Sequence, residues 1–193
     1  MKNLAIFASG TGSNAQKIID HFRSSRDARV CLILSNKPDA GVLKIASSEN
    51  IPALVINKDE FFRGKAYIHE LKEKKTDLII LAGFLWKIPI SLIQAFPDRI
   101  INIHPALLPK YGGRGMFGHH VHDAVIAAGE KETGMTIHFV DELFDHGRNI
   151  FQVSVPVEPG DNAQDIARKV QVLEHKYYPE VIDVIIQKLK PAD

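Results

Sequence analysis

The feature that most constrains the fold is a regular alternation between short apolar runs and longer segments of helical periodicity, which continues to about residue 128. The apolar runs are unbroken, as in "LAIFA" and "DLIILAG". Unbroken apolar strands separated by helices are typical of a parallel sheet covered on both faces. The sequence therefore predicts an α/β fold with a doubly wound, mostly parallel sheet. We expect strands at 4–8, 29–35, 53–56, 77–83 and 99–104, and helices at 14–25, 41–50, 59–75, 89–95 and 118–128.

The pattern changes after residue 133. "GMTIHFV" and "IFQVSVPV" read as two further strands, arranged like a hairpin, and a long helical segment spans 162–189. Pro179 falls inside that segment and predicts a break or a kink, because proline removes a helical hydrogen bond. No repeat or low-complexity segment divides the chain, so we expect a single domain over 1–193.

The composition excludes several classes of partner. The 24 Lys and Arg residues balance 23 Asp and Glu residues, which argues against nucleic acid or a membrane surface as the main partner. No run approaches the roughly 18 apolar residues of a membrane span. The single cysteine, Cys31, lies in an apolar strand and is expected to be a small core residue. Together these features favour a protein of a reducing compartment, the cytoplasm.

The expected fold locates the binding site before any motif is considered. Ligands of open parallel sheets bind outside the carboxyl ends of the strands. The site is therefore expected in the loops that begin near residues 9, 35, 83 and 104.

The first of these loops is a glycine turn, "SGTGSNA". Gly10, Gly12 and Ala15 satisfy the spacing G-x-G-x-x-G/A between a strand and a helix. This spacing fits either a tight turn or a phosphate cradle made of backbone N–H groups at a helix start. A dinucleotide site would also need an acidic residue at the tip of the second strand, where "SNKPD" has none. With Ser13 and Asn14 at the helix start, a sugar phosphate is the preferred ligand.

The last of these loops follows two polar residues, Asn102 and His104, at a strand end. Residues two apart on a strand share a face, so an amide and an imidazole can both donate to an oxygen that gains negative charge. This requirement is typical of acyl transfer through a tetrahedral intermediate. No G-x-S-x-G nucleophile elbow is present, so the nucleophile is expected to belong to the substrate. A carboxylate should assist the imidazole, and the residues alone leave Asp141, Glu142 and Asp145 open.

A histidine cluster follows in "FGHHVHDA", with His119, His120 and His122. The cluster lacks a familiar zinc spacing of cysteine or acidic ligands, so we expect a solvated helix start and no metal.

Several runs, in order along nearly the whole chain, resemble the phosphoribosylglycinamide formyltransferase family, folate-dependent enzymes of purine biosynthesis. The resemblance rests on "FASGTGSN", "SNKPDAGVL", "LAGFLWKI", "NIHPALLPKY", "HFVDELFDHG" and "VLEHKYYP". It implies a Rossmann-like formyltransferase fold. It also implies transfer of a formyl group from 10-formyltetrahydrofolate, the cosubstrate, to the amine of 5′-phosphoribosylglycinamide. Such a fold would have a phosphate-binding half, about 1–100, and a catalytic and folate-binding half, about 101–193.

The resemblance also implies roles for individual residues. Asn102 and His104 would meet the developing oxyanion, and Asp145 would assist proton transfer. The phosphate would be held by Gly12, Ser13 and Asn14, and the ribose by Glu174. The folate would be held by Leu85, Trp86, Lys87 and Ile88, together with Asn102.

The chain departs from the family pattern at several places. Trp86 stands where an Arg is often found, and Arg63 and Lys65 are both candidates for a basic residue that reaches the folate. The glycine-rich segment 111–118 is longer than in many members, and it could be a lid or a fixed loop. Two alternative functions stay open: hydrolysis of 10-formyltetrahydrofolate, and non-catalytic sensing of a sugar phosphate. The protein is expected to be a monomer or a homodimer.

Overall fold

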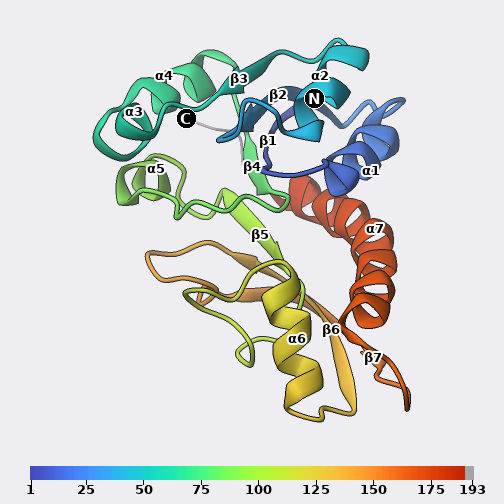
Figure 1. The fold of residues 1–193 in the computed structure, drawn as a ribbon. Helices are drawn as coiled ribbons and strands as arrows, with labels where there is room; N and C mark the ends of the chain where they lie inside the picture. The colour runs from blue at the N-terminus through green and yellow to red at the C-terminus, as the bar shows by residue number, and fades with distance from the viewer. Residues whose placement is uncertain (190–193) are drawn as a thin grey trace.

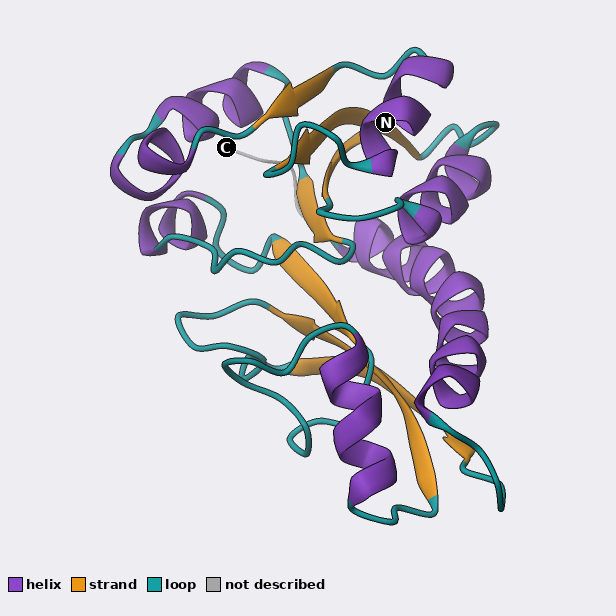
Figure 2. Ribbon diagram, viewed as in Figure 1, coloured by secondary structure: helices purple, strands orange, loops and turns teal. Residues whose placement is uncertain are grey.

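The computed structural model describes residues 1–189, so the last four residues of the predicted domain, 190–193, lie outside the description. A seven-stranded sheet has the order β3-β2-β1-β4-β5-β6-β7 (Figures 1 and 2). The first five strands pair in parallel, and β6 and β7 are antiparallel additions at one edge. The strands are β1 (Lys2–Phe7), β2 (Ala28–Ser35), β3 (Ala53–Val55), β4 (Leu78–Leu81), β5 (Ile100–His104), β6 (Glu132–Phe139) and β7 (Asn149–Pro156).

Helices cover both faces of the sheet. One face packs against α1 (Ser13–Phe22), α2 (Gly41–Ser48) and α7 (Ala163–Lys188). The other packs against α3 (Lys58–Arg63), α4 (Ala66–Glu73) and α5 (Ile90–Ala95). A further helix, α6 (His119–Ala127), lies against α7. The predicted doubly wound, mostly parallel fold is confirmed, because the unbroken apolar strands fill two separate cores.

Two of the expected helices differ from the structure. The segment expected as one helix over 59–75 is two, α3 and α4, because Gly64 has an extended backbone at the junction. Conversely, α7 runs through Pro179 without the expected break. Pro179 is buried in the middle of this helix, so packing on the sheet outweighs the loss of one helical hydrogen bond.

Hydrogen bonds at two places hold the long helix α7 in position beside the site. Asn162 and Asp165 form a reciprocal capping box at its start. In the second half of the helix the buried Tyr178 hydroxyl donates to the Leu81 carbonyl, 2.9 Å away, at the end of β4. This bond holds the middle of α7 beside the carboxyl ends of the parallel strands. Among residues 1–189, no helix is long and apolar enough to cross a membrane.

Candidate active site

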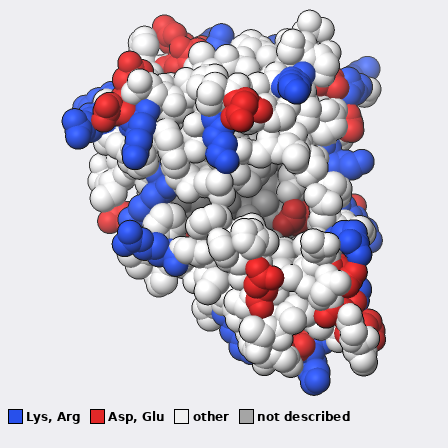
Figure 3. Space-filling model, viewed as in Figure 1, with Lys and Arg blue, Asp and Glu red and all other residues white. Residues whose placement is uncertain are grey.

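A pocket of about 570 Å³ opens at the carboxyl ends of β4 and β5, where the parallel topology predicts a ligand site. The face shown in Figure 3 is hollowed near its centre, and mostly uncharged side chains surround the hollow. The pocket draws residues from both halves of the chain. They include nine of the residues predicted for the site: Asn14, Leu85, Trp86, Lys87, Ile88, Asn102, His104, Asp145 and Glu174.

The three predicted catalytic residues converge in this pocket. Asn102 and His104 project from the end of β5, and Asp145 lies in the connection between β6 and β7. Asp145 Oδ2 is 3.5 Å from His104 Nδ1, and Asn102 Nδ2 donates to Asp145 Oδ1 over 3.4 Å. Of the three acidic candidates, Asp145 is thus the one beside the imidazole. Asp141 instead pairs with His146, at 2.9 Å, and Glu142 is exposed.

The hydrogen bonds of His104 define its tautomer. Its Nε2 is 2.7 Å from the carbonyl oxygen of Tyr111, and a carbonyl oxygen can only accept, so Nε2 carries a hydrogen. The proton that can be gained or lost is therefore on Nδ1, the atom that faces Asp145. Burial lowers the pKa of His104, and the Asp145 carboxylate works against this.

The carboxyl group of Asp145 is held in its charged form. Burial alone would raise its pKa, but the neighbouring His138 and His104 and the Gly113 N–H together lower it. The Gly113 N–H donates to Asp145 Oδ2 over 3.0 Å. The pair can therefore accept and return a proton at His104 Nδ1 while Asp145 stays ionised.

His138 is a site residue that the sequence analysis did not single out. It lies on β6 directly opposite Asn102 and is 2% exposed. Its Nδ1 donates to the Phe139 carbonyl, so its Nε2 accepts from Asn102 Nδ2 at 3.1 Å. Both hydrogens of the Asn102 amide are therefore engaged, and the long bond to Asp145 is the one that an incoming oxyanion can replace. The sequence did offer a signal for His138, because a histidine stands two residues before the end of the predicted strand "GMTIHFV".

Only one of the three residues predicted to hold phosphate lines the pocket. Asn14 lines the pocket, whereas Gly12 and Ser13 lie beside it at the start of α1. Gly12 has φ of 85°, and a Cβ there would come within 2.9 Å of the Val42 Cα. The need for glycine at this position therefore comes from the backbone angle and from α2, in addition to any approach by a ligand.

Glu174 and Asn14 form the polar end of the pocket. Asn14 Nδ2 donates to Glu174 Oε2 over 2.8 Å, which links α1 to α7. Burial raises the pKa of the Glu174 carboxyl, and the bond from Asn14 works against that rise. Asn14 Oδ1 is buried without a partner among residues 1–189, so it is free to accept from a ligand hydroxyl.

The predicted folate segment forms the apolar side of the pocket. Ile88 is buried, Trp86 is half-buried, and Leu85 is 43% exposed. The centroid of the Trp86 ring lies 5.6 Å from that of Phe62 and 5.9 Å from that of Phe61, so helix α3 packs against this ring. Neither Arg63 nor Lys65 lines the pocket, and Arg63 is exposed near Asp59. Neither basic candidate therefore reaches a folate in this conformation.

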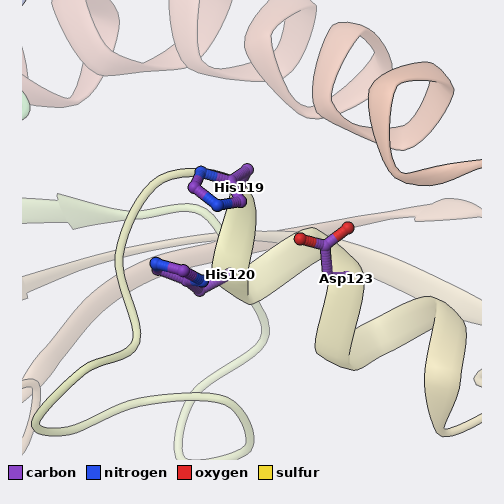
Figure 4. A group of neighbouring side chains, drawn as sticks. All are labelled: His119, His120 and Asp123. Atoms are coloured by element: carbon purple, nitrogen blue, oxygen red, sulfur yellow. The ribbon is translucent and has the colours of Figure 1, made fainter.

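The histidine cluster divides into two parts. His119 and His120 are exposed with Asp123 on the first turns of α6 (Figure 4), and their ligand atoms lie within 4.8 Å of one another. The positive end of a helix repels a cation, which disfavours a metal at these side chains. His122 was expected on a solvated helix start, and that expectation is wrong. It is 7% exposed, lines the pocket, and has an Nδ1 without a partner among residues 1–189.

The glycine-rich segment borders the pocket on the side of α6. Residues 113–118 all line it, and Gly113, Gly115 and Gly118 have positive φ angles of 94°, 90° and 56°. A Cβ at any of these three would meet nothing within 4 Å. Glycine at these three positions is therefore explained by the backbone angles and not by close packing. The segment is loosely packed.

Comparison with known proteins shows the family of this chain. The model of the formyl transferase family matches residues 2–182. The chain belongs to the formyl transferase family. It is 35% identical to the phosphoribosylglycinamide formyltransferase of Bacillus subtilis, over 96% of this chain and 95% of that protein. It is 42% identical to the chloroplastic phosphoribosylglycinamide formyltransferase of Arabidopsis thaliana, over 97% of this chain and 66% of the relative.

Among solved structures of the formyl transferase family, the glycinamide ribonucleotide transformylase 1 of Geobacillus kaustophilus has a TM-score of 0.86 and 38% identity. It is matched over 96% of this chain and 99% of its own. The predicted family, its Rossmann-like fold and the predicted class of formyl-transferring enzyme are confirmed. The chain spans about two thirds or less of the length of the plant relatives.

Proposed function

We propose that this formyl transferase family member transfers a formyl group from 10-formyltetrahydrofolate to the amine of 5′-phosphoribosylglycinamide, a step of purine biosynthesis. The observation that carries the proposal is the pocket itself. Its lining combines Asn102, His104 and Asp145 with the polar pair Asn14 and Glu174 and with the mostly apolar residues 85–88. The polar pair suits a ribonucleotide and the apolar residues suit a pterin ring, and the same pocket holds the acid–base group.

The geometry supports a direct transfer. The substrate amine would attack the formyl carbon, and the carbonyl oxygen would become an oxyanion near Asn102 and His104. The amine would lose one proton, His104 Nδ1 would accept it with Asp145 as its charged partner, and the folate nitrogen would be protonated as its bond to carbon breaks. The product amide and the deformylated folate would then leave. No enzyme nucleophile is needed.

Each end of the pocket has a proposed role. We propose that Glu174 and Asn14 accept from the ribose hydroxyls, since a carboxyl group and an unpartnered amide oxygen are both available there. Gly12, Ser13 and Asn14 at the start of α1 would hold the phosphate through backbone N–H groups. Residues 85–88 would pack on the folate, with Asn102 beside its formyl group.

The partners that fit this proposal are small molecules. The near-neutral charge balance supports neither nucleic acid nor a membrane as a partner, and no metal is needed for the steps above. Action in the cytoplasm, and a monomeric or homodimeric state, stay predictions.

One assay separates this function from hydrolysis and from sensing. The protein is mixed with 10-formyltetrahydrofolate, with and without 5′-phosphoribosylglycinamide, and deformylation of the folate is followed by absorbance. Transfer requires turnover that depends on the ribonucleotide. Equal turnover without it would indicate a hydrolase, and binding of the ribonucleotide without any turnover would indicate a sensor.

A further inference from the structure

The short segment Tyr111–Gly113 contacts two of the three candidate catalytic residues through its backbone. The Tyr111 carbonyl accepts from His104 Nε2 over 2.7 Å, and the Gly113 N–H donates to Asp145 Oδ2 over 3.0 Å. These are the bonds that place one hydrogen on Nε2 and turn Nδ1 toward the carboxylate. The position of this backbone therefore sets the tautomer of His104.

Tyr111 is held in an unfavourable backbone conformation. Its φ is 57°, in the left-handed region that a residue with a Cβ adopts at a cost. Such a conformation persists only where other contacts determine it. Its neighbours do not supply that restraint, since the following residues are glycines.

The side chain of Tyr111 supplies the restraint. Its hydroxyl donates to Glu130 Oε1 over 2.9 Å, and Lys110 Nζ donates to the same oxygen over 2.8 Å. Hydrogen bonds from Lys110 and from Tyr111 lower the pKa of Glu130, so this acceptor is charged at neutral pH. Glu130 lies two residues before β6, the strand that pairs with the end of β5 and carries His138.

Packing alone does not fix the ring. Tyr111 and Glu130 border a second cavity of about 250 Å³, and none of the described residues that line it lines the large pocket. A ring beside open space is free to shift unless a polar bond holds it. The bond to Glu130 is therefore the contact that fixes Tyr111.

We propose that Tyr111 is a positioning residue, anchored on Glu130, whose carbonyl keeps His104 in the tautomer with hydrogen on Nε2 and leaves Nδ1 to exchange the reaction's proton. Without the anchor, the Asp145 carboxylate would draw the hydrogen of the neutral imidazole to Nδ1. The consequence for catalysis rests on the function proposed above, whereas the tautomer is a property of the protein without substrate.

The first test is long-range proton–nitrogen NMR of the full chain at pH 8, with His104 resonances assigned from a His104→Asn variant. We expect the wild type to show only the tautomer with hydrogen on Nε2. Tyr111→Phe, which removes the hydroxyl alone, and Glu130→Ala should both show a mixture of the two tautomers. Lys110→Ala is the matched control, because it removes the other donor to the same oxygen, and its His104 spectrum should match the wild type.

The second test is the steady-state kinetics of the same variants. Tyr111→Phe should lower kcat about tenfold and change the KM of each substrate less than about twofold, as expected for an interaction that matters in the transition state. Wild-type tautomer and wild-type kcat in Tyr111→Phe would overturn the proposal, as would an equal tautomer shift in Lys110→Ala. If the wild type transfers no formyl group, the proposed function fails, and the NMR result still decides the role of Tyr111.

Discussion

At the scale of single residues, the site depends on a meeting of three side chains that are up to 43 positions apart. Asn102 and Asp145 are joined by a bond of 3.4 Å across that separation. Asn102 comes from a strand end, and Asp145 comes from a connection in which its own φ is 52°. The chemistry of the amide and the imidazole is useful only in this arrangement, since each needs the carboxylate to orient or charge it.

Removal of these side chains should slow turnover far more than it weakens folding. Loss of one oxyanion donor typically costs about a hundred- to a thousandfold in kcat, so Asn102→Ala and His104→Ala should each lose at least that much. Asp145→Asn preserves shape and removes charge, and should lower kcat more than it raises KM. Glu142→Gln is the control, because Glu142 is exposed on the same connection. Near-normal turnover in His104→Ala would rule out its direct participation.

Gly12 gives a prediction about folding. A Cβ at this position meets the α2 backbone at 2.9 Å, and φ is 85°. Gly12→Ala should therefore lower the free energy of unfolding by about 1–2 kcal/mol from the backbone angle alone. Urea denaturation without any ligand measures this, and Gly10→Ala is the control, because a Cβ at Gly10 meets nothing within 4 Å. An unchanged unfolding free energy, with only the ribonucleotide KM raised, would show that the ligand alone requires the glycine.

At the scale of elements, the helix α7 connects stability to the site. It carries Glu174 to the pocket and begins at the capping box of Asn162. The cap satisfies N–H groups that have no partner within the helix. The helix end is far from Glu174 along the chain, so its cap should affect stability and not the pocket.

Asn162→Ala should therefore cost about 1 kcal/mol of unfolding free energy. The Asn162 side chain accepts from the Gln164 and Asp165 N–H groups, at 2.8 and 3.1 Å. Gln164→Ala is the matched control, because its exposed side chain takes no part in the cap. Urea denaturation should separate the two variants, while the KM of the ribonucleotide stays the same in both. A loss of stability as large in Gln164→Ala would contradict a role for the cap.

At the scale of the whole molecule, stability should depend on pH through buried histidines. Burial lowers the pKa of His104, His122 and His175 below the ordinary value of about 6.5. Each therefore binds more protons in the unfolded chain once the pH is below that value. Their contribution to stability is complete above about pH 7.5 and is lost as the pH falls through 6.5 toward their lowered pKa values. Asp145, whose pKa is also lowered, adds a further loss only at more acidic pH. The raised pKa of Glu174 acts in the opposite direction, but it is one group against three histidines.

Urea denaturation at pH 7.5 and at pH 5.5 should therefore show a lower free energy of unfolding at the acidic pH. His122→Asn should reduce this difference, because it removes one buried titrating group. His120→Asn should leave it unchanged, since His120 is exposed on the same helix. An equal free energy of unfolding at both pH values would contradict the buried-histidine explanation.

The sequence by itself determined the order of elements, the parallel sheet and the edge that carries the site. These follow from local periodicity and from the handedness of strand–helix units, which neighbouring residues encode. The resemblance of the quoted sequence segments to the formyltransferase family added the expected roles of Asp145 and Glu174.

Only the tertiary structure decided how these residues meet. His138 reaches Asn102 through strand register, and His122 turns inward because α6 lies against α7. Gly12 is confined by a helix about thirty residues later, and Arg63 is exposed and does not line the pocket. Contacts between distant segments depend on how whole elements pack, and no local pattern records that packing.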